Sequence, residues 1–171
     1  ESQLVRIEKG EKVRAKENVI MVHCFSNRDK RRRFHLYETT ELCKTAGFHI
    51  LEETTQVRSK LDPTTLMGKG KLEELCQICL ELNPDYVIFG HDLSPTQVRN
   101  IENMIDHPVL DRTQLILDIF GKHAKSSEGK LQVELARLKY QLPRLATKST
   151  MLSRITGGIG GRGPGETKAE I

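Results

Sequence analysis

Apolar residues between positions 19 and 111 follow two alternating patterns. Short continuous apolar runs, rich in β-branched and aromatic residues, predict strands that are buried on both faces. These runs lie at 19–25, 48–57, 86–90 and 108–111. Apolar residues at helical spacing lie between them, over 36–46, 70–82 and 95–106. Strands that alternate with helices predict an α/β fold with a small parallel sheet and flanking helices.

The pattern changes from Thr113 onward, where leucines repeat at heptad spacing. The repeat consists of Leu131, Leu135, Leu138, Leu142 and Leu145. Such a seam predicts a long helix that packs on a partner helix, and Pro143 is expected to end or kink it. Three partners stay open: the sheet domain, a second copy in a dimer, or a helix that begins near Glu166 and continues past Ile171. We favour the last, which makes the long helix one arm of an antiparallel helical hairpin.

These patterns divide the chain into three parts. They are an N-terminal α/β domain at 1–112, a long helical arm at 113–156, and a Gly-rich hinge with the start of a returning helix at 157–171. Charge is distributed unevenly between them. From residue 121 onward the chain has ten Lys and Arg and four Asp and Glu. The preceding residues have 17 Lys and Arg and 19 Asp and Glu. A basic arm behind a near-neutral domain favours a polyanionic partner for the arm, and an ordinary solvated helix is the alternative.

The expected location is cytoplasmic. No apolar run approaches the roughly 18 residues of a membrane-spanning helix, so no membrane span is predicted. The first residues are charged and show no signal-peptide pattern.

The four cysteines are predicted to be reduced thiols. Cys76 and Cys79 form a C-x-x-C pair, which on its own also suits half of a zinc site or a redox pair. Both fall on the apolar stripe of the helix predicted over 70–82, and no second pair accompanies them. Because free cysteines prefer protein interiors, we interpret them as core residues. No metal site is predicted.

Two helix starts carry distinct signals. Ser94, Pro95 and Gln97 form a capping box with proline at the first helical position,. The helix over 70–82 instead follows a Gly68–Lys71 turn, where Lys69 and Lys71 oppose the positive end of the helix dipole,. A nearby anion would relieve that repulsion. Lys69 and Lys71 are therefore a candidate nucleotide- or anion-binding site, and two solvated lysines are the alternative.

Polar residues follow three of the predicted strands. His91 and Asp92 follow one strand, and Asp111 and Arg112 follow another. Open α/β sheets bind ligands at this edge, but Asp beside Arg also forms structural ion pairs. The basic run Asn27–Arg33 follows the first strand. It suits either RNA phosphates or a solvated loop.

The segment from Gly157 to Glu166 has the densest glycine content of the chain. It comes close to a phosphate-binding P-loop, but Glu166 stands where that loop requires lysine. No strand precedes the segment, as a dinucleotide-binding turn requires. We therefore interpret it as a hinge or hairpin tip. No catalytic residue is predicted, because the sequence shows no Ser/His/Asp arrangement or carboxylate pair at a specific spacing.

Several segments, taken together, resemble the HflX family of translational GTPases. They are GKGKLEEL from Gly68, DLSP from Asp92, DRTQLILDIF from Asp111, EGKLQVELA from Glu128, LPRL from Leu142 and the closing GGIGGRGPGET. Their order and spacing resemble the family over residues 48–171, and the first 45 residues fit loosely. His91 stands where many members carry an acidic residue.

The resemblance implies a modular protein with an α/β domain, a helical hairpin and a Ras-like G domain. It implies GTP and Mg²⁺ as cofactors of a G domain beyond Ile171, with none for this chain, so an enzymatic activity is expected only of the longer protein. The implied partners are the protein's own G domain and the large ribosomal subunit, with a role in splitting or rescuing ribosomes.

From the basic arm and this resemblance we predict contacts with ribosomal RNA around the hairpin tip. The predicted RNA-binding residues are Arg144, Lys148, Arg154 and Arg162. Two alternatives remain: a nucleotide-binding α/β domain that uses the Gly68–Lys71 turn, and a scaffold that only holds the G domain.

Overall fold

The computed structural model describes the backbone of residues 16–156 and the side chains of residues 16–145. In chain order the elements are β1 (Asn18–Ser26), α1 (Arg32–Thr45), β2 (His49–Arg58), α2 (Lys69–Leu82), β3 (Tyr86–Phe89), α3 (Pro95–Ile105), β4 (Val109–Leu110), α4 (Arg112–His123) and α5 (Ser127–Thr156). The α/β class is confirmed, and each predicted strand and helix of the first 111 residues is present.

The sheet has four parallel strands in the order β2-β1-β3-β4. The chain moves outward from β1 to β2 and then crosses to β3 and β4 on the other side. The direction of winding therefore reverses between β1 and β3, and the carboxyl ends of these two strands border the crevice where open α/β sheets bind ligands.

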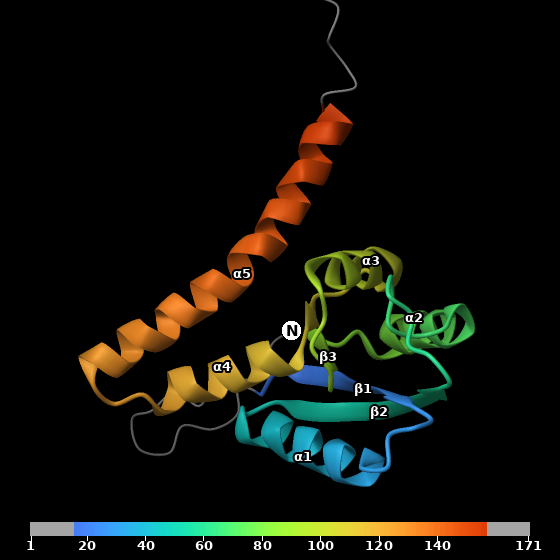
Figure 1. Cartoon of the computed structure of the whole chain (residues 1–171), viewed down its shortest axis with the longest axis horizontal. Helices are drawn as coiled ribbons and strands as arrows, with labels where there is room; N and C mark the ends of the chain where they lie inside the picture. The colour runs from blue at the N-terminus through green and yellow to red at the C-terminus, as the bar shows by residue number, and fades with distance from the viewer. Residues whose placement is uncertain (1–15, 157–171) are drawn as a thin grey trace, which may run out of the picture.

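Helices cover both faces of the sheet (Figure 1). Ile20, Val22 and Cys24 of β1 face a core that includes residues of α2 and α3, whereas Val19 and Met21 face a core with residues of α1 and α4. The central strand is buried on both sides because its apolar run is uninterrupted, as parallel strands require.

The arm predicted over 113–156 consists of two helices. α4 ends at His123, and α5 starts at Ser127. Leu115 of α4 is fully buried in the core beside α1, so α4 covers the sheet. From the far end of α4 the chain turns, and α5 rises past α3 and extends beyond the α/β layers (Figure 1).

Of the two predicted effects of Pro143, the end of the helix does not occur, and the kink stays a prediction. The helix continues through Pro143, which is exposed. Proline removes the hydrogen bond to the carbonyl of Lys139, and because Lys139 is also exposed, water can satisfy that carbonyl. α1 begins at Arg32, four residues before the predicted helix, so the end of the basic run forms its first turn.

The leucine seam of α5 faces solvent on the described part of the chain. Its five leucines are between 53% and 71% exposed. α5 packs on α3 and α4, yet more than half of each seam leucine stays exposed. The sheet domain therefore does not cover the seam, while the returning helix and the dimer stay predictions.

The cysteines are free thiols, as predicted. Burial raises the pKa of Cys24 and Cys43 to about 12 and that of Cys79 to about 11. No cluster of metal-ligating side chains occurs among the residues that the structure describes. Over the same residues, no helix has the length and apolarity needed to cross a membrane.

Candidate functional site

A buried aspartate at the carboxyl end of β4 joins the sheet to α5. Asp111 is 0% exposed and is the N-cap of α4. Its Oδ1 accepts the backbone N–H of Gln114 at 3.0 Å, and its Oδ2 accepts that of Leu93 at 3.2 Å. Asp111 Oδ2 also accepts from Arg144 Nη2 at 3.1 Å and from the Tyr140 hydroxyl. One carboxylate thus ties together the loop before α3, the start of α4 and the middle of α5.

Arg144 is the other centre of this network. Its guanidinium lies 3.7 Å from the centroid of the Tyr140 ring and donates to the carbonyl of Leu93. Only 12% of the Arg144 side chain is exposed. Burial and the hydrogen bond to Asp111 raise the pKa of Tyr140 above its usual range. The geometry gives Arg144 an anchoring role, and its predicted contact with RNA stays a prediction.

The other predicted RNA contacts lie farther along the arm. Lys148 and Arg154 belong to the last three turns of α5, where the structure describes the backbone alone. This end of α5 projects beyond the sheet and its helices (Figure 1). Arg162 and the glycine segment lie outside the described residues. The geometry leaves Lys148 and Arg154 at the end of α5 that is farthest from the core.

The two lysines of the Gly68 turn pair within their own helix. Lys71 Nζ lies 2.9 Å from Glu74, and Lys69 Nζ lies 4.0 Å from Glu73. The N–H of Gly68 donates to the Gln56 side chain at 2.9 Å. These pairs offset part of the repulsion between the lysines and the helix dipole. Nucleotide binding at this turn stays a prediction.

Two histidines, His23 of β1 and His91 after β3, lie on either side of the Phe25 ring, with ring centroids 6.2 Å and 5.7 Å from it. Burial, followed by the charge of His91, lowers the pKa of His23 to about 4. Burial also lowers the pKa of His91. His23 is 1% exposed, and its Nε2 has no hydrogen-bond partner among the described residues. Asp92, after His91, accepts from the Thr113 hydroxyl at 2.6 Å. Asp92 thus contacts the start of α4, whereas Nε2 of His91 is buried without a hydrogen-bond partner among the described residues.

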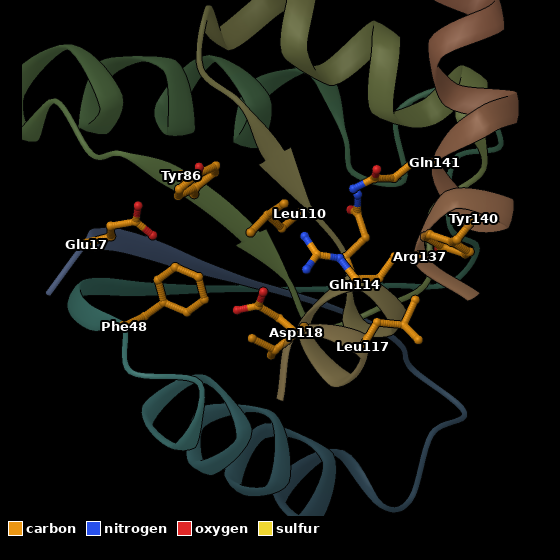
Figure 2. Close-up of a pocket in the computed structure, with 11 residues that line it drawn as sticks. Glu17, Phe48, Tyr86, Leu110, Gln114, Leu117, Asp118, Arg137, Tyr140 and Gln141 are labelled. Carbon is orange, nitrogen blue, oxygen red and sulfur yellow. The ribbon is translucent and has the colours of Figure 1, made fainter. Parts of the chain in front are cut away.

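A cavity of about 310 Å³ lies where α5 crosses the sheet domain (Figure 2). Phe48, Tyr86 and Leu110 supply apolar walls, and Arg137 reaches into it from α5. Asp118, also at the cavity, pairs with Lys122 at 3.2 Å. No sequence pattern predicted this cavity, because its lining residues are far apart along the chain and share no motif.

Family profiles match almost the whole chain after residue 32. One described as "GTP-binding GTPase N-terminal" matches residues 33–121, and one described as "GTP-binding GTPase Middle Region" matches residues 123–171. The chain is 50% identical to a protein named GTPase HflX from Alkalihalophilus pseudofirmus, over 90% of this chain and 37% of that protein. It is 42% identical to GTPase HflX of Escherichia coli, over 91% of this chain and 36% of that protein.

Solved structures have a related fold. A GTP-binding protein from the archaeon Sulfolobus solfataricus, crystallised with GDP, matches with a TM-score of 0.57 and 27% identity, over 76% of this chain and 39% of that one. A variant named SsGBP G235S matches with a TM-score of 0.59 and 25% identity, over 75% of this chain and 41% of that one. The chain thus spans less than half the length of these relatives.

Proposed function

This chain belongs to the HflX family of GTPases, and from that premise we propose that it is the ribosome-binding region of a GTP-binding protein. In this proposal the α/β domain is the platform, and α5 carries basic residues to RNA of the large ribosomal subunit. GTP hydrolysis, with Mg²⁺, belongs to a G domain, which the α/β domain and α5 would accompany in the longer protein. Splitting or rescue of ribosomes would be the outcome in the cytoplasm.

The observation that carries the proposal is the position of α5. It is anchored at its middle by Arg144 and Tyr140, and its distal end holds Lys148 and Arg154 away from the core. From residue 121 onward the chain carries a net charge of +6, from ten basic and four acidic residues. A basic projection on a fixed base suits insertion into a polyanion.

The exposed leucine seam supports a helical hairpin. Five leucines on one face of α5 expose more than half of each side chain. A contiguous apolar face of this kind marks a contact surface. We propose that a returning helix starting near Glu166 covers it, with the glycine segment as the tip and Arg162 beside it.

Neutralising the distal basic residues should weaken ribosome binding. The variant Lys148→Ala/Arg154→Ala/Arg162→Ala removes three phosphate contacts in this proposal, so its affinity for large subunits should fall at least tenfold. The slope of log affinity against log salt should also decrease in size by about 2, from roughly 0.7 per contact. Pelleting with large subunits at several salt concentrations measures both. Arg144 stays unchanged, because its removal would also break the anchor.

A matched control is available on the α/β domain. Lys16→Ala/Lys44→Ala/Lys60→Ala removes the same charge from exposed positions near the sheet edges, and its binding should stay within twofold of the unchanged chain. Equal losses in both variants would mean that general charge, and not the arm, governs binding. No binding by the unchanged chain would favour the scaffold alternative.

A further inference from the structure

A groove at the start of α1 combines positive charge with an exposed aromatic ring, that of Phe34. It has a volume of about 590 Å³ and lies between the β1–α1 loop, the first turns of α1 and the end of β2. Phe25, Phe34 and Val57 line it, together with Lys30–Arg33. We call this feature the basic–aromatic groove. It lies at the carboxyl edge of the sheet.

The charges of the groove are not neutralised within the described part of the chain. Arg28, Lys30, Arg31, Arg32 and Arg33 are exposed. No ion pair joins any of them to a carboxylate among the residues that the structure describes. Asp29 lies between them, and its Oδ1 accepts the backbone N–H of Arg31 at 2.8 Å. The local charge therefore stays strongly positive.

The first turn of α1 increases this positive potential. Arg31 is the N-cap, makes no side-chain capping hydrogen bond, and is followed by Arg32 and Arg33 with no acidic residue in that turn. Basic residues at a helix N-terminus repel the helix dipole. An anionic partner in the groove would remove that repulsion.

Few aromatic residues are strongly exposed among the described side chains, and two of them lie on α1, where Phe34 lines the groove and Tyr37 follows it by three residues. Aromatic residues make up 5% of the sequence. Phe34 is 60% and Tyr37 is 65% exposed, and Phe120 on α4 is the other strongly exposed ring among the described side chains. Because positions 34 and 37 are three residues apart on a helix, the two rings lie on neighbouring turns of one face. Neither Phe34 nor Tyr37 belongs to the core clusters of the described residues.

We propose that the basic–aromatic groove binds single-stranded RNA. The arginines and Lys30 would contact phosphates, and bases would stack on Phe34 and Tyr37. Positive charge alone would suit any polyanion, but exposed rings beside it are the arrangement that proteins use for unpaired bases. This inference takes its biological setting from the proposed ribosome association, yet it concerns a surface that is separate from α5.

The test measures binding of a fluorescently labelled single-stranded RNA of about 12 nucleotides by fluorescence anisotropy. Arg32→Gln/Arg33→Gln should lower the affinity at least fivefold and reduce the salt slope by about 1.4, from roughly 0.7 per phosphate contact. Lys16→Gln/Lys44→Gln removes equal charge from exposed residues at the opposite edge of the sheet, and should leave both values nearly unchanged.

The aromatic half has its own pair of variants. Phe34→Ala/Tyr37→Ala should lower affinity about tenfold or more with an unchanged salt slope, because base stacking is independent of counterion release. Phe120→Ala, which removes an exposed ring elsewhere, should have little effect. Thermal unfolding of each variant checks that the fold is intact.

Several results would overturn the inference. They are equal effects of the groove and control variants, equal affinity for a duplex of the same sequence, or binding to anionic lipid vesicles without binding to RNA. Ribosome pelleting separates this inference from the proposed function. If the RNA binds through the groove but the chain does not pellet with ribosomes, the groove inference holds and the ribosome proposal is rejected. If the chain pellets with ribosomes but the groove variants bind RNA as well as the unchanged chain does, the ribosome proposal holds and the groove inference is rejected.

Discussion

Replacing Asp111 with alanine should destabilise the fold by about 3–5 kcal/mol. The substitution removes the N-cap of α4 and the carboxylate that accepts from Arg144 and Tyr140. It breaks the largely buried ion pair between Asp111 and Arg144. Loss of an N-cap alone costs about 1 kcal/mol, so most of the expected effect comes from the broken buried pair. Urea unfolding followed by circular dichroism measures the change in free energy.

The matched variant Asp111→Asn separates the two contributions. Asparagine caps helices as well as aspartate does, so α4 should keep its start while the charge that pairs with Arg144 is lost. The free energy of unfolding of Asp111→Asn should therefore lie between that of the unchanged chain and that of Asp111→Ala. Hydrogen exchange should show faster exchange of amides in the middle of α5 in both variants. A loss below about 1 kcal/mol in Asp111→Ala would contradict the anchoring role.

Acid should destabilise the chain before its carboxylates titrate. His23 has a pKa of about 4 in the folded chain against 6.5 in the unfolded chain, so between these values the unfolded state binds more protons. The stability that depends on a neutral His23 is fully present above pH 6.5 and is lost as the pH falls toward 4,. The full loss amounts to about 3 kcal/mol, at about 1.4 kcal/mol per pH unit. The lowered pKa of His91 acts in the same direction.

The pH effect can be assigned to His23 by substitution. His23→Gln should reduce the slope of unfolding free energy against pH between 7 and 5.5 by roughly 1 kcal/mol per pH unit. Met21→Leu alters the neighbouring core position on the same face of β1 without removing a titratable group, so it should keep the slope. The same slope in all three chains would show that His23 does not govern the acid response.

The strands and the first three helices could be predicted because their signals are local. The buried strands appear as uninterrupted apolar runs, and the capping box of Ser94 and Gln97 is present with both hydrogen bonds. The end of α4 and the start of α5 were missed. Whether Leu115 faces the sheet or a partner helix depends on the path of the whole chain, which no local pattern records.

The roles of charged residues were harder to predict than the fold. Arg144 and Asp111 are 33 positions apart, and the sequence alone does not indicate that α5 brings them to 3.1 Å. Asp111 and Gln114 do match a capping box, so the sequence contained a signal for the structural role of Asp111. The neighbouring Arg112 pairs with Glu38, not with Asp111. The partner of a charged side chain often lies far away in the sequence, whereas the spacing of apolar residues can be recognised within a single helix or strand.

Sedimentation of the chain with purified ribosomal subunits tests the central claim most directly. Equal amounts of large and small subunits are pelleted separately with the same concentration of chain. We predict that the chain sediments with the large subunit, that added salt releases it, and that the small subunit retains at most a tenth as much. Equal amounts in both pellets, or none in either, would contradict the proposed function.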